Sequence, residues 1–203
     1  TYLKIMQVFY ILGFIISLST CIQATLDAKV GKCLSDLTTK EITISHNYLQ
    51  LSSKFGTTNA YPGFSSLFTK LSDKDSHKSH ELVKFIALRK FKLERLISKD
   101  GIKIHNGLTS TFDIREGLKQ ARDQNKELWK EVTGCHDAPD QDANVQDYLE
   151  SHLLDHHIEI DKLLADLEHR IDDAQTSDKK LITFMIDEEL LETYGDRRKD
   201  IFS

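Results

Sequence analysis

The stretch Phe64–Arg89, FSSLFTKLSDKDSHKSHELVKFIALR, decides the fold, because its apolar residues recur every three or four positions. This spacing predicts an α-helix with one face toward a core. At the centre of that face, Asp75 and Lys78 replace the apolar residues. A buried acid–base pair is costly unless a partner helix satisfies it. The stretch therefore predicts either a structural ion pair or a site, working or vestigial, of buried chemistry.

The composition of the whole chain fits a single helical domain. Of 203 residues, 39% are hydrophobic and 29% are charged, and only two are proline. These proportions match an ordinary globular domain and not a disordered chain. The net charge of −5 is spread along the sequence, so the chain has no basic surface for nucleic acid and no polybasic segment for a membrane.

The segment Thr1–Ala24 differs in kind from the rest. Lys4 precedes the apolar run Ile5–Leu18, and small and polar residues follow up to Ala24. This order is typical of a secretory signal peptide. A transmembrane anchor is the alternative, but the apolar run is shorter than the ~20 residues that a span needs. We therefore expect residues 25–203 to form a secreted domain without a stable membrane anchor.

Cys33 and Cys135 are the two cysteines that remain after such a segment is removed. In an oxidising compartment they favour a disulfide, either within one chain or between two chains. Two free thiols are the alternative. The sequence has no C-x-x-C motif, so it suggests neither a redox motif nor a structural zinc site.

Helical patterns flank the opening stretch on both sides. The first runs over 34–55, with Glu41 and Tyr48 on its core face and Gly56 at its predicted end, and Pro62 suits the first turn of the second helix. A third runs over 114–132 after a capping box at 110–113 and is predicted to end at Gly134. A fourth runs over 145–171, interrupted by His157, and a short fifth covers 181–191. The long connection 90–106 lets a four-helix bundle run up-down-down-up.

This ordered set resembles a ferritin subunit, and in particular the light-type subunit of secreted arthropod ferritins. The residues that carry the resemblance are Glu41…Tyr48-Leu49, Pro62-Gly63-Phe64, Leu71-Ser72-Asp73, Gly117-Leu118 with Asn125…Leu128, and Tyr148-Leu149-Glu150-Ser151-His152-Leu153-Leu154. The resemblance implies an all-α, ferritin-like four-helix bundle with a long crossover between helices 2 and 3 and a short fifth helix at the C-terminus.

The resemblance also implies a di-iron site that has lost its function. Catalytic family members bind two irons through carboxylates, a histidine and a nearby glutamine, beside a tyrosine that Tyr48 matches. The corresponding positions here are Glu41, Asp75, Lys78, Ala121 and His157. An ammonium offers no lone pair to a metal, and alanine removes a bridging ligand. We expect no ferroxidase activity, and we expect Glu41 and Asp75 to hold Lys78 in an internal salt bridge rather than to bind a metal.

Other polar residues are candidates for iron entry and nucleation. Asp147 and Glu150 match the acidic pair of the family's three-fold channel, which attracts Fe²⁺ through oxygen ligands. The channel histidine position reads Val132. At the family's mineral-nucleating positions stand Lys74, His77 and His80, which makes nucleation there doubtful. The histidines at 152 and 156 lack the glutamate of H-E-x-x-H, and we assign them to a solvated or interface face.

These features predict an iron-storing subunit of a secreted shell. The resemblance implies twenty-four subunits, a heavy-type partner subunit, Fe²⁺ in transit and a ferric mineral in the cavity. An active ferroxidase subunit with an altered site is the first alternative. The second is a secreted helical signalling or carrier bundle that never assembles.

Overall fold

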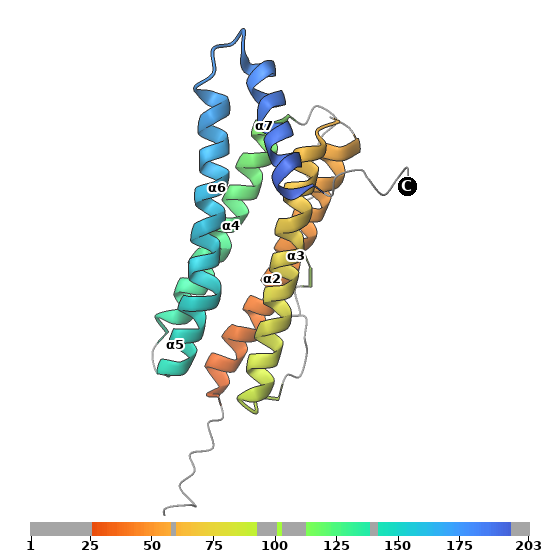
Figure 1. The fold of residues 1–203 in the computed structure, drawn as a ribbon. Coiled ribbons are helices and arrows are strands. Elements are labelled where there is room, and N and C mark those ends of the chain that lie inside the picture. The colour runs from red at the N-terminus through yellow and green to blue at the C-terminus, as the bar shows by residue number, and fades with distance from the viewer. Residues whose placement is uncertain (1–25, 58–59, 93–100, 103–112, 139–141, 196–203) are drawn as a thin grey trace, which may run out of the picture.

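The computed structural model describes residues 26–57, 60–92, 101–102, 113–138 and 142–195, and these contain helices and no strand. The elements are α2 (Ala28–Thr57), α3 (Pro62–Leu88), α4 (Ile114–His136), α5 (Ala143–Leu149), the π-helix η1 (Glu150–Leu154), α6 (Asp155–Asp172) and α7 (Lys179–Tyr194). Because α5, η1 and α6 follow one another without a break, they form a single rod (Figure 1). The predicted all-α fold with a fifth helix is confirmed.

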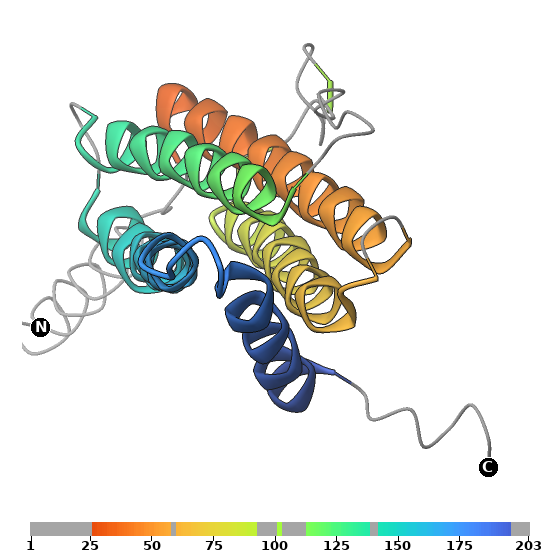
Figure 2. The same ribbon diagram turned by 90° about the horizontal axis from the view of Figure 1, so that it is seen from above.

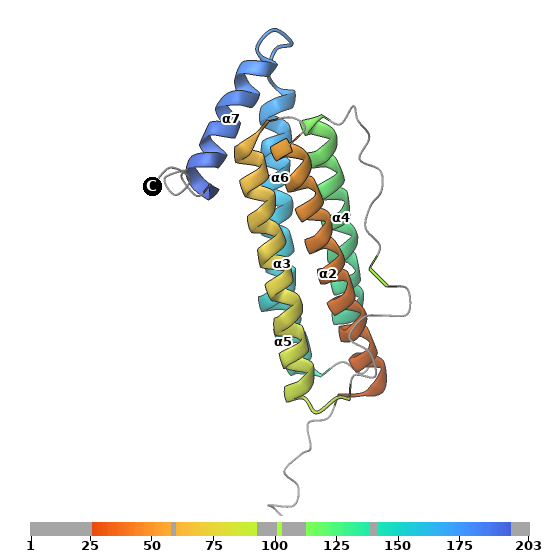
Figure 3. The same cartoon turned by 90° about the vertical axis from the view of Figure 1, so that its right-hand side faces the viewer.

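The four long rods form a bundle. α2 packs against α3 and α4, and α4 packs against α6, so the rods occupy four corners when seen from above (Figure 2). α3 and α4 run in the same direction, as the up-down-down-up order requires (Figure 1). α7 lies outside the bundle at an angle to it and packs on α3 and α6 (Figure 3). Most of the predicted crossover 90–106 lies outside the described residues.

Aromatic rings fill the end of the core where α2 meets α3. The ring of Phe55 stacks on those of Phe64 and Phe68, with centroids 5.4 and 5.3 Å apart, and Tyr48 lies 5.8 Å from Phe68. All four side chains are fully buried. Burial of such a side chain stabilises the fold by about 1.5–3 kcal/mol. The aromatic cluster therefore anchors the α2–α3 hairpin from which Glu41 and Asp75 project.

The start of α3 explains how α7 is held. Pro62 occupies the first turn, as predicted, and the backbone N–H of Phe64 donates to Asp187 Oδ1 at 2.9 Å. Gly63 lies so close to α7 that a Cβ built on it would be 1.8 Å from the carbonyl oxygen of Asp187. The sequence Pro62-Gly63-Phe64 therefore combines a helix start with a close approach between two helices.

Two predicted helix ends are wrong. α2 continues through Gly56 to Thr57, and α4 continues through Gly134 to His136. A glycine ends a helix when it adopts a positive φ, and neither of these two does so. The predicted cap at the start of α4 is confirmed for Asp113, whose side chain accepts the N–H of Glu116 at 2.7 Å. Residues 110–112 of that capping box lie outside the described residues.

A disulfide joins Cys33 of α2 to Cys135 of α4, with the two Cα atoms 5.9 Å apart. The bond lies within one chain, which decides between the pairings that the sequence left open.

None of the helices in the described ranges is long and apolar enough to cross a membrane. The predicted signal peptide, residues 1–24, lies outside these ranges.

Candidate functional site

A cluster of polar side chains occupies the centre of the bundle. Glu41 comes from α2, Asp75 from α3, Asn125 from α4, and both His156 and His157 from α6. Four of these side chains are fully buried, and the side chain of His156 is 10% exposed. The sequence predicted Glu41, Asp75 and His157 for this position, and the structure brings them together.

His157 is fixed by hydrogen bonds on both ring nitrogens. Its backbone oxygen accepts from Asn125 Nδ2 at 2.8 Å, which leaves the Asn125 side-chain oxygen to accept from His157 Nδ1 at 2.9 Å. His157 Nε2 faces Glu41 Oε1 at 3.0 Å. The Asn125 amide therefore places the imidazole proton on Nδ1, and a further proton is shared between Nε2 and Glu41.

Burial decides where that shared proton resides. Burial raises the pKa of Glu41 to about 8, although the charges of His156 and Lys78 oppose the shift. Burial also lowers the pKa of His157. Both shifts favour the neutral pair, because a charge removed from water is costly. At neutral pH, Glu41 is therefore a carboxylic acid that donates to His157.

Asp75 forms the second carboxyl–imidazole pair. Its Oδ1 lies 2.7 Å from His156 Nε2. Burial raises the pKa of Asp75 to about 6, and the hydrogen bond from His156 is the largest opposing effect. At pH 7 Asp75 is thus mostly ionised and accepts from His156. The second pair differs from the first because its carboxyl keeps its negative charge.

Three oxygens at the centre of the cluster have no hydrogen-bond partner among the described residues. They are Glu41 Oε2, Asp75 Oδ2 and the hydroxyl of Tyr48. Burial, followed by the nearby Asp75 and Glu41 charges, raises the pKa of Tyr48 well above its usual value, so Tyr48 remains a phenol. Tyr48 thus lies beside the carboxyls, as the sequence predicted.

The predicted salt bridge of Lys78 with Glu41 and Asp75 is wrong. Lys78 is half-buried, and its Nζ donates to Glu81 Oε2 at 3.1 Å. The long stem lets the ammonium leave the core and avoid desolvation. His156 takes its place beside Asp75, so the expectation that His156 lies on a solvated or interface face is also wrong. Lys78 still acts through its charge, which lowers the pKa of Glu41 and of His157.

The π-helix η1 accounts for the two adjacent histidines in the core. The N–H of Asp155 donates to the oxygen of Glu150, five residues earlier, which widens the helix just before His156. His156 then reaches Asp75 on α3, while His157 reaches Glu41 on α2. A sequence pattern could have indicated this turn. The buried positions 145, 149, 153 and 157 recur at steps of four, wider than the ~3.6 of an α-helix.

The cluster does not form an open metal site in this arrangement. Ala121, at the predicted third-helix ligand position, is fully buried and offers no donor. Each imidazole is held by a carboxyl, and the described ranges contain no group of three or more His, Cys, Asp or Glu residues placed to hold a metal ion. Carboxyls and imidazoles are nevertheless groups that bind iron. In the present geometry, the carboxyls of Glu41 and Asp75 form hydrogen bonds with the two imidazoles instead, and Glu41 is protonated.

The predicted channel acids lie on the surface of the rod. Asp147 and Glu150 are exposed, and Glu150 Oε1 lies 2.8 Å from His136 Nε2. Asp137 Oδ1 lies 2.6 Å from the other ring nitrogen of His136, and the hydrogen bonds that His136 donates to Asp137 and Glu150 raise the His136 pKa. The assignment of Val132 as the channel histidine position is wrong, because Val132 is fully buried in the core. The histidine beside Glu150 is His136, which the sequence pattern did not indicate.

The remaining candidates lie away from the central cluster. The exposed His77 lies 3.5 Å from Glu81, and His80 is exposed on the same helix. The ring of His152 stacks on Tyr148 at 4.5 Å, and Tyr148 stacks on Phe85 at 4.1 Å. His77, His80 and His152 form no hydrogen bond or ion pair with Glu41 or His157 among the described residues, so they do not contribute to that pair.

A comparison with solved structures shows which known fold this chain resembles. No family model and no curated protein matches the chain. Among solved structures, the crystal structure of the secreted ferritin of Trichoplusia ni matches with a TM-score of 0.72 and 25% sequence identity. The match covers 84% of this chain and 88% of that chain, so it spans nearly the whole bundle. The chain is thus a ferritin-like helical bundle that is similar to a secreted arthropod ferritin.

Proposed function

We propose that this chain is an iron-storage subunit of a secreted ferritin shell, of the light type that lacks a working ferroxidase centre. The observation that carries the proposal is the hydrogen-bonded set Glu41, His157 and Asn125, which spans three helices at the centre of the bundle. A neutral carboxyl and an imidazole engaged on both nitrogens offer Fe²⁺ little charge and few lone pairs. Ala121 adds no ligand from α4.

Assembly into a shell is supported by the outer face of α7. Leu181, Phe184 and Met185 are each more than half exposed, at 60%, 56% and 55%. Adjacent exposed apolar side chains of this kind mark a surface that another chain covers. We propose that the shell has twenty-four subunits and that a heavy-type subunit supplies the iron oxidation that this chain lacks.

Iron entry is assigned to the acidic surface of the rod. Asp147 and Glu150 lie one turn apart and are exposed, so copies related by a three-fold axis would form a ring of carboxylates. Such a ring attracts Fe²⁺ and holds it hydrated. The protonated His136 beside Glu150 would reduce that negative charge at low pH.

Secretion is supported by two features. The segment Thr1–Ala24 reads as a signal peptide, and the Cys33–Cys135 disulfide suits an oxidising compartment. The similarity to a secreted ferritin agrees with both. Secretion of the chain by cultured cells, with a mature N-terminus near residue 25, is the expected result.

The test of the proposed role is Fe(II) oxidation in air, followed by the absorbance of Fe(III). The chain alone should match the uncatalysed background, and a mixed shell with a heavy-type subunit should oxidise and store iron.

One observation favours the alternative of an active subunit, because the buried Glu41 Oε2, Asp75 Oδ2 and Tyr48 hydroxyl lack partners within the described ranges. Fast, saturable oxidation by the chain alone, abolished by Glu41→Ala, would establish that alternative. A stable monomer in size-exclusion chromatography, with or without the partner, would instead favour a non-assembling bundle.

A further inference from the structure

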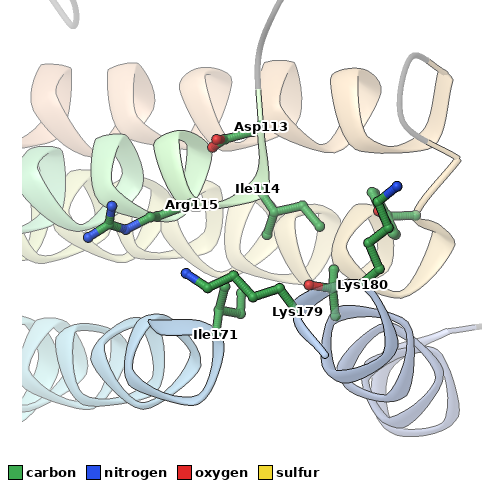
Figure 4. Close-up of a pocket in the computed structure, with 8 residues that line it drawn as sticks. Asp113, Ile114, Arg115, Ile171, Lys179 and Lys180 are labelled. Carbon is green, nitrogen blue, oxygen red and sulfur yellow. The ribbon is translucent and has the colours of Figure 1, made fainter. Parts of the chain in front are cut away.

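A pocket of about 650 Å³ lies where α4 and α7 begin, at one end of the bundle (Figure 4). Its apolar wall is formed by Tyr61, Ile114 and Ile171. Lys179 and Lys180 line it from the start of α7, and their side chains extend in different directions in this view. Pockets of this size accommodate small organic molecules. The pocket is remote from the Glu41–His157 pair, which lies midway along the bundle.

Two other charged residues of the pocket are already engaged. Arg115 binds Asp172 through two nitrogens, at 2.9 and 3.0 Å. Asp113 caps α4 by accepting the N–H of Glu116. Neither Lys179 nor Lys180 forms a salt bridge with any residue in the described ranges. The side chains that line the pocket therefore carry more positive than negative charge.

Lys179 and Lys180 lie at the start of α7, where positive charge opposes the helix dipole. Asp178, at the N-cap position, makes no side-chain capping bond, and the first turn of α7 contains no acidic residue. By contrast, Asp113 caps α4, and Asp187 accepts the N–H of Phe64 at the start of α3. The helix dipole disfavours lysine at an N-terminus and favours an anion there. Two lysines at the start of α7 thus oppose the helix dipole, and Asp178 supplies one negative charge beside them.

Thr183 provides an independent indication of a ligand. It lines the pocket one turn after Lys179 and is only 8% exposed. No hydrogen bond to its side chain is formed by the part of the chain that the structure describes. Other threonines of these helices, such as Thr38 and Thr193, bond the carbonyl four residues earlier. The hydroxyl of Thr183 is therefore free to bond a group in the pocket.

We propose that this pocket binds a small organic anion with an apolar body, such as a medium-chain carboxylate. The carboxylate lies at the start of α7, where Thr183 donates a hydrogen bond and Lys179 or Lys180 supplies the charge. The alkyl part lies against Ile114, Ile171 and Tyr61. This site does not depend on iron binding or on the proposed storage function.

The test is displacement of the fluorescent anion 8-anilinonaphthalene-1-sulfonate from the purified protein, in the oligomeric state that it adopts in solution. Octanoate should release bound probe, whereas acetate and octylamine at equal concentrations should not. The double variant Lys179→Gln, Lys180→Gln should need about tenfold more octanoate, as expected for one lost charge-assisted hydrogen bond. Thr183→Val should weaken the competition in the same direction.

Lys130→Gln is the matched control, because Lys130 is an exposed lysine near the far end of α4. It removes one charge and should leave octanoate competition unchanged. The double variant is expected to fold, because it removes lysines from a helix N-terminus that disfavours them. The proposal is overturned if octanoate releases no probe, if acetate competes as well as octanoate, or if the double variant behaves like Lys130→Gln.

Discussion

His157 Nε2 lies 3.0 Å from Glu41 Oε1, and neither side chain is exposed to solvent. The bond connects α2 to α6 across the bundle, and Asn125 extends it to α4 through two further hydrogen bonds. Because Asn125 fixes the imidazole proton on Nδ1, the neutral pair requires Glu41 to be protonated. The centre of this bundle therefore holds a proton at the position where the resemblance to ferritins implies iron.

This proton makes the stability of the chain depend on pH. The Glu41 pKa is 4.5 in the unfolded chain and about 8 in the folded one. The folded state therefore holds a proton that the unfolded state releases, and stability falls as the pH rises from 4.5 to 8. Each unit of pKa difference corresponds to about 1.4 kcal/mol.

Glu41→Gln should remove most of this pH dependence. Glutamine has the shape of the protonated acid, and its amide can donate to His157 Nε2 at every pH. The denaturant midpoint of the variant, compared with wild type between pH 5 and pH 8, checks this. Asp73→Asn, at an exposed position of α3, is the control and should keep the wild-type slope. Equal slopes for wild type and Glu41→Gln would show that Glu41 is ionised throughout.

The periodicity of the sequence predicted the helical bundle and three of the residues at its central cluster. Stripes at steps of three and four place Glu41, Asp75 and His157 on core faces, and all three are fully buried. Helix periodicity determines where a Cα–Cβ bond points, so short side chains are predicted well. The same pattern put Lys78 in the core, but its flexible stem carries the ammonium to Glu81.

His156 could not be placed by the same reasoning. A helix of constant pitch turns it away from the stripe, and only the π-helix η1 brings it to Asp75. The pairing of the cysteines and the role of His136 also required three-dimensional proximity, since Cys33 and Cys135 are 102 residues apart in sequence. Long-range contacts of this kind leave no periodic trace in one sequence.

Gly63→Ala should detach α7 from the bundle. An added Cβ would lie 1.8 Å from the carbonyl oxygen of Asp187, a contact with backbone that cannot yield easily. We expect faster proteolysis between α6 and α7 and a loss of assembled particle in size-exclusion chromatography. Gly134→Ala is the matched control, because nothing lies within 4 Å of its added Cβ. It should stabilise α4 by up to about 1 kcal/mol. Normal assembly of Gly63→Ala would show that α7 docks in another way.

The disulfide should give a compact monomer on non-reducing gels and not a covalent dimer. Reduction should slow its migration, because Cys33 and Cys135 close a loop over a sequence separation of 102 residues. Cys33→Ser with Cys135→Ser should lower the free energy of unfolding by about 2–5 kcal/mol. A covalent dimer that is converted to monomer by thiol reagents would instead show that the cysteines join two chains. Full reaction of both thiols with maleimide in the native protein would show that no bond forms.

Restoring ligands should return iron oxidation to this bundle. The triple variant Lys78→His, Ala121→Glu, His157→Gln adds an imidazole and a carboxylate, and it removes the imidazole that holds the Glu41 proton. Glu41 can then ionise and ligate, since a metal cation favours the carboxylate form. Asp75 is the weak point, because it is one methylene shorter than the glutamate of catalytic family members and must leave His156. We expect saturable oxidation above background, measured by Fe(III) absorbance in air.

The control for that experiment is Lys78→His, Ala121→Gln, His157→Gln, which has nearly the same volume but lacks the new carboxylate. It should remain at background, because no bridging ligand is present. Far-UV circular dichroism of both variants checks that the helices persist. If the triple variant is folded and assembled yet oxidises iron no faster than its control, the exchanges at 78, 121 and 157 do not suffice, and the proton held between Glu41 and His157 is not the sole cause of the inactivity.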